Sequence, residues 1–411
     1  MSTRAKPALN LGEFTPLMAL MISLVALSID AMLPALSNIG LDLGVEENND
    51  QQLIVSALFL GLGVGQLIYG PLSDSIGRKS AIYSGYVIFI IGCMISILST
   101  NFEIMLLGRV LQGLGAAGPR IVCIALVRDQ YEGREMARIM SFVMGVFILV
   151  PALAPALGQG IMMISGWRAI FISFLIIAVI AWVWFALRQP ETLPAEQRVR
   201  FSFFVIWSGV RETCRNRTAF GYTIIAGFVY AALVGYLSSS QQMFSVIYDI
   251  TDMFPLYFAV LALAVGFSSI INGRLVMKFG MRLLSFWALM ILMILSSAFF
   301  LYALNVDGTP GLWMNMAYFI SAFLCFGLLF GNLNALAMEP LGHIAGIGAA
   351  VIGSLSTFVS VFFGAIIGQM FDATVLPLVG GFALLAVMAL VLMHWTERGR
   401  RGEQATGSPL R

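Results

Sequence analysis

The sequence predicts an all-α integral membrane protein with 12 transmembrane helices, arranged as two six-helix bundles. Of its 411 residues, 59% are hydrophobic and only 11% are charged, whereas soluble globular proteins carry about 25% charged residues. Apolar runs recur along the whole chain, and about 20 such residues are enough to span a bilayer. Because lipid offers no hydrogen-bonding partners to an open backbone, each run is predicted to be a helix.

Twelve spans are predicted, each ended by a short polar segment. They cover residues 15–36, 52–72, 80–99, 103–127, 136–162, 167–187, 219–241, 253–273, 283–304, 311–334, 346–370 and 374–395. The first run is too long for a signal-peptide core and lacks a small-x-small cleavage site, so we expect it to be retained.

The charges alternate between successive breaks. All Lys and Arg residues except Arg109, Arg120 and Arg168 fall at the two termini or in every second break. The breaks between these carry acids instead, namely Asp42, Glu46, Glu47, Asp50, Glu103, Asp249, Asp252, Asp307 and Asp372. By the positive-inside rule, both termini are predicted to be cytoplasmic. A net charge of +2 favours neither nucleic acid nor an acidic partner.

The longest polar segment divides the chain into two sets of six spans. We predict an N-terminal bundle over 1–187, a cytoplasmic linker over 188–217, a C-terminal bundle over 218–395 and a cytoplasmic tail over 396–411. "GPLSDSIGRK" after span two is repeated weakly as "GRLVMKFGMR" after span eight. Repeated six-helix halves are typical of secondary transporters, whose substrate site lies between the halves.

Several motifs resemble one family. "GQLIYGPLSDSIGRKS" after span two and "LLGRVLQGLGAAG" in span four resemble signatures of major facilitator transporters, and "PALAPALGQ" resembles the fifth-helix antiporter signature, with Gln159 in place of the usual second glycine. "GWRAIF" and "GHIAG" extend the resemblance over nearly the whole chain. Together they resemble the drug:proton antiporters of the bicyclomycin and chloramphenicol resistance (Bcr/CflA) group, which implies a proton-driven exporter in a bacterial inner membrane.

Asp30 lies inside the first span, where an unpaired charge costs about 2.5–3.5 kcal/mol. Arg109 in span four is matched to it in depth, since both lie about six residues, or roughly 9 Å, below the outer boundary. Two interpretations are open. Asp30 takes part in proton coupling or substrate binding, or it forms a static buried ion pair with Arg109. The family resemblance links both positions to transport.

Arg120 follows Arg109 by eleven residues, so it faces the same way and lies roughly 16 Å deeper. It is not part of the family signature. One interpretation is an anion- or carbonyl-binding group in the substrate path, and the other is an arginine that extends to the cytoplasmic interface or pairs with a loop acid.

The loop after span two is predicted to form a gate, and the alternative is that its charges only orient the chain in the membrane. Gly70 and Gly77 permit close helix approach and a tight turn, and Asp74 and Arg78 follow on the cytoplasmic side. The resemblance implies that Asp74 docks on the N-terminal end of span eleven, where the helix dipole favours an anion. Arg78 is then expected to pair with Asp129 and latch the outward-open state.

Span five contains Pro151, Pro155 and Gly158, which weaken the helix and permit bending or close packing. Structural packing alone would also explain them, and the antiporter resemblance favours a hinge.

A candidate substrate pocket combines aromatic rings and hydrogen-bonding groups, namely Phe59, Tyr236, Gln241 and Tyr257. Aromatic residues in membrane helices also serve to pack neighbouring helices or face lipid. The histidines and the scattered cysteines have no metal-ligand spacing, so neither a metal nor an organic cofactor is expected.

The leading functional hypothesis is proton-coupled efflux of drugs or other small amphipathic compounds by alternating access. The alternative is a dedicated exporter of a metabolite such as a siderophore or amino acid, and an uptake symporter is a further alternative. No P-loop motif is present, and we expect no enzyme activity. The expected partners are a small-molecule substrate, protons and membrane lipid, with the chain acting as a monomer.

Overall fold

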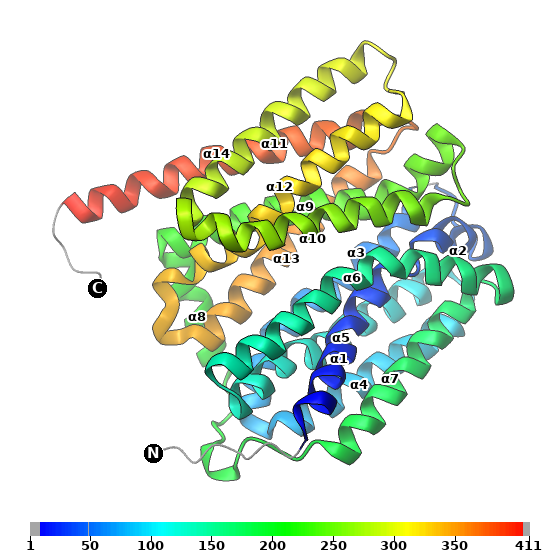
Figure 1. The fold of residues 1–411 in the computed structure, drawn as a ribbon. Coiled ribbons are helices and arrows are strands. Elements are labelled where there is room, and N and C mark those ends of the chain that lie inside the picture. The colour runs from blue at the N-terminus through cyan, green and yellow to red at the C-terminus, as the bar shows by residue number, and fades with distance from the viewer. Residues whose placement is uncertain (1–8, 48, 406–411) are drawn as a thin grey trace. The chain divides into compact units, whose positions relative to one another are not determined.

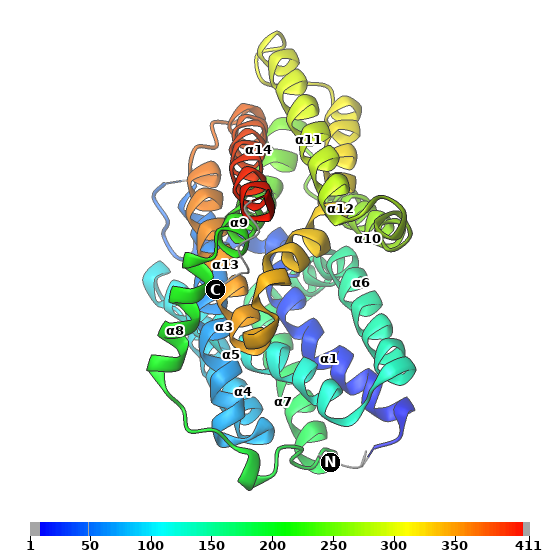
Figure 2. The same cartoon turned by 90° about the vertical axis from the view of Figure 1, so that its left-hand side faces the viewer.

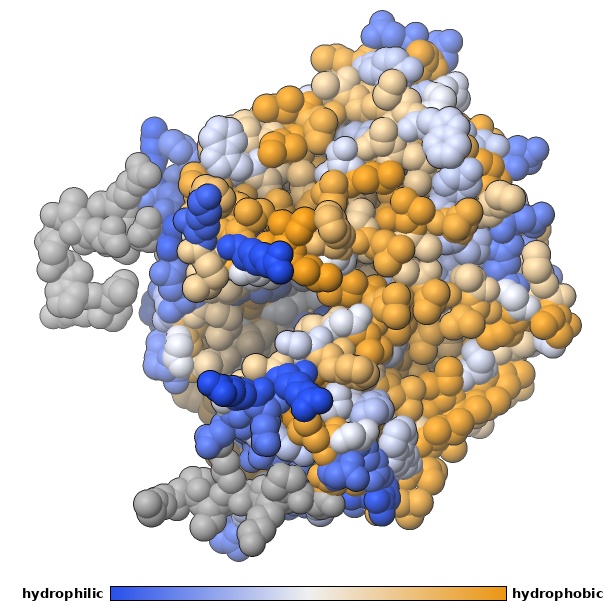
Figure 3. Space-filling view, in the orientation of Figure 1, coloured by the Kyte–Doolittle hydropathy of each residue, from blue (hydrophilic) through white to orange (hydrophobic). Residues whose placement is uncertain are grey.

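The computed structural model describes residues 9–47 and 49–405, with side chains up to residue 398. Within these residues, eleven helical segments are long and apolar enough to cross a membrane. One of them, Leu312–Gln369, contains two long helices in succession, so the described chain has twelve spans. The predicted all-α membrane class is confirmed, and apolar side chains dominate the face drawn in Figure 3.

The first compact unit runs to Phe203 and also takes in Ile250–Leu263. Its α-helices are α1 (Leu11–Asp30), the short α2 (Leu36–Asp42), α3 (Leu53–Ile76), α4 (Arg78–Ile97), α5 (Phe102–Gln130), α6 (Gly133–Ser165) and α7 (Arg168–Arg188). Short 3-10 turns occur at Leu33–Ala35, Asp50–Gln52 and Ala195–Gln197. α1 packs against α5, α6 and α7, while α5 packs against α3 and α4 (Figures 1 and 2).

Small residues bring α5 close to its neighbours. A Cβ atom added at Gly113 would lie 1.9 Å from the Leu58 carbonyl oxygen of α3, and one at Gly115 would lie 2.3 Å from the Phe89 nitrogen of α4. Such approaches are possible only without a side chain, and they are the usual means by which membrane helices pack tightly. The glycine-rich signature of span four is therefore used here for helix packing.

The second compact unit comprises Phe204–Asp249 and the chain from Ala264 onward. Its helices are α8 (Phe203–Arg215), α9 (Arg217–Gln242), α10 (Phe254–Phe279), α11 (Met281–Leu304), α12 (Leu312–Met338), α13 (Ala345–Gln369) and α14 (Leu376–Ala405). A π-helical turn over Met243–Ile247 follows α9, and a 3-10 segment over Glu339–Ile344 follows α12. The start of α10 up to Leu263 clusters with the first unit, and its remainder with the second.

Asparagine residues begin three of the spans. The side-chain oxygens of Asn10, Asn101 and Asn216 accept hydrogen bonds from the backbone N–H groups three residues later, at 2.8, 2.9 and 2.9 Å. These bonds satisfy N–H groups that have no partner within the helix.

The predicted domain boundaries remain predictions. α14 continues to Ala405, into the segment predicted as a tail, and the tail residues 406–411 lie outside the described chain. The basic residues predicted to orient the N-terminus, Arg4 and Lys6, also lie outside it.

Candidate functional site

The first span is broken after Asp30. α1 ends at this residue, and a 3-10 turn over Leu33–Ala35 leads into α2. Pro34 explains the interruption, because it has no N–H to donate to the Asp30 carbonyl four residues earlier. We expected a continuous helix with Asp30 about six residues from its outer end. That expectation was wrong, since Asp30 is the last residue of its helix, and we call residues 30–35 the break.

Asp30 is buried, with 5% of its surface exposed. Within the described chain, the ion pairs are formed by other acids, and none includes Asp30. A buried carboxylate without an ion pair requires a proton, water or a ligand. The break therefore presents a titratable group in an apolar interior.

Arg109 reaches the same end of α1 from α5. Its Nη2 atom donates to the Ser28 carbonyl at 2.8 Å, and its guanidinium lies 5.7 Å from the centre of the Phe171 ring. Ser28 is in the last turn of α1, where carbonyls lack helical partners. Arg109 thus binds the main chain two residues before Asp30, and the equal depth of the two residues below the outer boundary remains a prediction. A static ion pair between the two is not formed in the described residues.

A buried network orients Arg109. Its Nη1 atom donates to Gln112 Oε1 at 2.6 Å, and its Nε atom to the Ile54 carbonyl at 3.3 Å. The Gln112 amide in turn donates to Ser96 Oγ at 2.9 Å and to the Gly92 carbonyl at 3.2 Å. Sequence analysis missed Gln112, although its spacing of three residues from Arg109 places both on one helix face.

Gly158 of α6 lies directly against the break. A Cβ atom at this position would be 1.6 Å from the Ala31 carbonyl oxygen, so α6 and the first span touch backbone to backbone. Pro151 and Pro155 precede Gly158 within the same helix. The hinge predicted for these three residues remains a prediction. If α6 bends there, it would bend against the break, which Gly158 contacts.

Arg120 lies on α5, and its guanidinium is 5.8 Å from the centre of the Phe147 ring of α6. It is half-buried. This cation–π contact is compatible with both interpretations of Arg120, so its role remains a prediction.

The predicted gating loop is a single residue. α3 continues to Ile76, α4 begins at Arg78, and Gly77 between them has φ +97°, a conformation that favours glycine. The loop is shorter than predicted because helix α3 continues beyond residue 72, the predicted end of span two, to Ile76. Gly70 lies within this helix, where its carbonyl accepts a hydrogen bond from Ser73 Oγ at 2.9 Å.

Arg78 is buried and binds two acids. Its Nε atom donates to Asp129 Oδ2 at 2.9 Å, and its Nη1 atom donates to Asp74 Oδ1 at 2.5 Å. The predicted contact between Arg78 and Asp129 is confirmed. We call these three residues the latch, and its gating function remains a prediction.

The chain after α7 passes over the latch. The Glu191 carboxylate accepts the backbone N–H groups of Arg78 and Lys79, each at 3.0 Å, at the positive end of the α4 dipole. Val199 N donates to the Asp74 carbonyl at 3.0 Å. Sequence analysis missed these contacts, because irregular segments leave no periodic pattern.

The four candidate pocket residues fall in different units. Phe59 and Tyr257 belong to the first unit, and Tyr236 and Gln241 to the second. The Tyr236 ring is buried and packs against the rings of Phe319 and Phe323, at centroid distances of 5.3 and 4.9 Å. The common pocket remains a prediction.

The family model described as "Major Facilitator Superfamily" matches residues 18–365. The chain belongs to the Major Facilitator Superfamily. Superfamily members of solved structure share its fold. The xylose transporter XylE from E. coli aligns with a TM-score of 0.74 at 14% identity, covering 93% of this chain and 97% of XylE.

Curated relatives extend over almost the whole chain. The "Bicyclomycin resistance protein homolog" of Haemophilus influenzae is 28% identical, covering 91% of this chain and 94% of its own. The "Multidrug resistance protein D" of Escherichia coli is 23% identical, covering 82% and 84%. These relatives confirm the resemblance to the drug-efflux group. Family and fold are those of multi-pass membrane transporters.

Proposed function

We propose that this superfamily member is a proton-coupled antiporter that exports drugs or other small amphipathic compounds across a bacterial inner membrane. The observation that carries the proposal is the buried Asp30 carboxylate at the break, outside any described ion pair, with Arg109 bound to the main chain two residues away. Relatives named for bicyclomycin and multidrug resistance support this choice of substrate class.

Asp30 would alternate between two charge states. When it is ionised, the nearby Arg109 is the compensating charge, and when it is protonated, Arg109 returns to the Ser28 carbonyl and Gln112. Each change in the charge of Asp30 would thus change the contact that Arg109 makes with the end of α1. A proton that enters from outside would therefore bias the conformation of the break. The proton gradient replaces any cofactor, and no catalytic step is part of this cycle.

The latch would act at the cytoplasmic ends of α3, α4 and α5. Arg78 joins Asp74 of α3 to Asp129 of α5, so breaking these bonds frees the helix ends to separate. With both termini cytoplasmic, the latch would close the inner side of a monomeric transporter in its outward-open state.

The test compares wild type, Asp30→Asn and the control Asp307→Asn in vesicles with an imposed pH gradient. Asp307 is an exposed acid with φ +52°, a conformation that asparagine also adopts. Adding substrate should release protons from wild type and from the control, but not from Asp30→Asn, although this variant still binds the compound. Equal release from all three proteins would contradict the role of Asp30.

A dedicated exporter of an anionic metabolite is the second candidate, because Arg109 and Arg120 lie in the interior of α5, whereas Asp30 is the acid at the break of the first span. Offering the vesicles neutral, cationic and anionic compounds separates the two candidates. Proton release with a single anionic compound favours the metabolite exporter, and release with several chemically unrelated compounds favours the drug exporter.

A further inference from the structure

Helix α7 binds one end of the first span through an arginine and a tryptophan. Near the C-terminal end of α7, Arg188 forms a two-point bond to Glu13 of α1, with its Nε and Nη2 atoms 2.7 and 2.8 Å from the two carboxylate oxygens. The Trp184 indole donates to the same carboxylate at 3.2 Å. Glu13 is in the first turn of α1, so this contact holds the start of the span.

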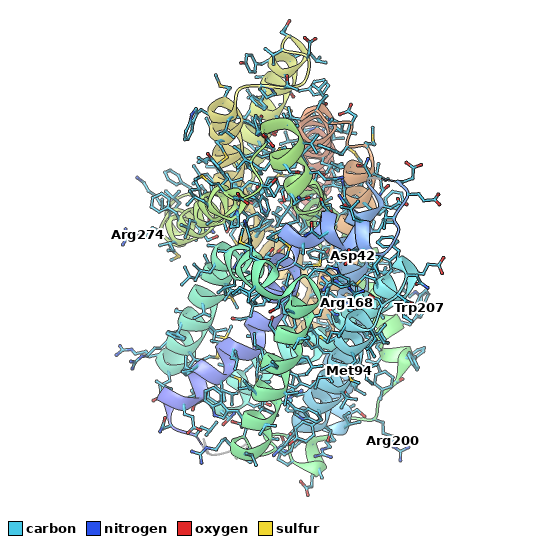
Figure 4. All side chains as sticks on the ribbon, turned by 90° about the vertical axis from the view of Figure 1, so that its right-hand side faces the viewer. Asp42, Met94, Arg168, Arg200, Trp207 and Arg274 are labelled. Carbon is cyan, nitrogen blue, oxygen red and sulfur yellow. The ribbon has the colours of Figure 1, made fainter. Side chains whose placement is uncertain are left out.

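The other end of α7 binds the other end of the span with the same residue types. The Trp167 indole donates to Asp42 Oδ2 at 2.7 Å. Arg168 Nη1 lies 3.5 Å from the same oxygen, and Figure 4 labels Asp42 and Arg168. The Arg168 guanidinium stacks 4.1 Å from the Trp167 ring centre and donates to the Ser99 carbonyl at 3.2 Å. Asp42 is the last residue of α2.

The two contacts form what we call the clamp, which consists of Glu13 with Trp184 and Arg188, and Asp42 with Trp167 and Arg168. Its ion pairs are partly exposed, and such pairs add little to stability. Bidentate arginine–carboxylate bonds and stacked arginines do, however, fix orientation. The clamp is therefore better suited to hold geometry than to supply folding energy.

The helices that the clamp joins differ in stiffness. α7 runs without interruption from Arg168 to Arg188 and contains neither proline nor glycine. The first span consists of two helices joined at the break. When both ends of the broken first span are fixed to the uninterrupted helix α7, movement within the span is confined to the break. In this chain the break begins at Asp30, Gly158 lies against the Ala31 carbonyl within it, and Arg109 binds the Ser28 carbonyl two residues before it.

We propose that Glu13 and Asp42 are positioning residues for Asp30. By fixing both ends of the first span to α7, they make a change in the charge of Asp30 act as bending at the break instead of sliding of the whole span. The proposal rests on the proposed function for the protonation step. Neither acid touches the transported proton.

The first test measures how substrate-evoked proton release depends on pH. The variants are Glu13→Gln, Asp42→Asn, their combination, and the control Glu103→Gln, an exposed acid in the first turn of α5. Freeing both ends should move the midpoint of the pH profile by about half a pH unit or more, since the surroundings of Asp30 change. A variant that carries both Glu13→Arg and Arg188→Glu should have the wild-type midpoint, because the ion pair is kept with its charges reversed. An unchanged midpoint in the double variant would overturn the proposal.

The second test does not depend on transport. Spin labels at Leu41 of α2 and Ile172 of α7, both exposed, report the distance between the outer end of the span and α7. In wild type, this distance should stay constant when the pH is changed or substrate is added. In Asp42→Asn, the distribution of distances should become broader. A wild-type distance that shifts beyond its own width would refute the clamp even if Asp30 couples protons. A constant distance combined with full coupling in Asp30→Asn would refute the proposed function and leave the clamp intact.

Discussion

Replacing Gly158 with alanine should force α6 away from the break. The added Cβ would lie 1.6 Å from the Ala31 carbonyl oxygen, 2.6 Å from its carbon and 3.0 Å from its Cα. Carbon–oxygen contacts between packed helices are about 3.3–3.6 Å, so the two backbones must separate by roughly 1.7 Å or more. Overpacking of this kind costs about 1–3 kcal/mol.

Two other glycines of the same helix provide matched controls. Cβ atoms at Gly145 and Gly160 would meet nothing within 4 Å. All three substitutions raise helix propensity equally, so the difference between Gly158→Ala and the controls isolates the contact with the break. We expect Gly158→Ala to melt several degrees below both controls, measured by tryptophan fluorescence in detergent, because about 1 kcal/mol corresponds to about 2–4 °C in a unit of this size. We also expect it to lose substrate-evoked proton release. Equal melting of the three variants would refute the close contact.

Two further predictions concern contacts outside the break. Glu191→Gln should lower the free energy of unfolding by about 0.3–1 kcal/mol and hasten proteolysis of the linker, because the negative charge at the start of α4 is lost. The control Glu196→Gln, in an exposed part of the linker, should match wild type. Equal proteolysis of the two variants would count against the contact. In the second unit, the amides of Asn272 and Asn332 donate to each other at 3.1 and 2.9 Å. Asn332→Leu should lower the free energy of unfolding, followed by thermal melting, by about 1 kcal/mol. Adding Asn272→Leu should recover most of this stability, since no unpaired amide then remains. A further loss of stability in the double variant would argue against this pairing.

Hydropathy was sufficient to predict the spans, because every predicted apolar run is helical in the described residues, the first of them as two helices joined at the break. The break was also predictable from the sequence, by the position of a proline. Pro34 follows Asp30 by four residues, the spacing at which proline removes a helical hydrogen bond. The length of the apolar run concealed it, since hydropathy continues unchanged across the interruption. The extension of α3 through Pro71 shows the opposite case, in which a proline did not end the helix.

The candidate site was predictable where a motif or a helical register related its members. The pairing of Arg78 with Asp129 and the placement of Arg109 beside the end of α1 are of this kind. The binding of Arg109 to a main-chain carbonyl was not predictable, because every carbonyl is alike in sequence. The clamp left a weak signal, an arginine and a tryptophan at each end of span six, but its acids are over 100 residues distant in the chain.

The most direct measurement is the infrared difference spectrum recorded when substrate is added to the reconstituted transporter near neutral pH. If Asp30 carries the coupled proton, wild type should lose a protonated-carboxyl band as substrate binds, and Asp30→Asn should show no such band while still binding substrate. A band of the same size in Asp30→Asn would place the coupled proton on another residue and contradict the account.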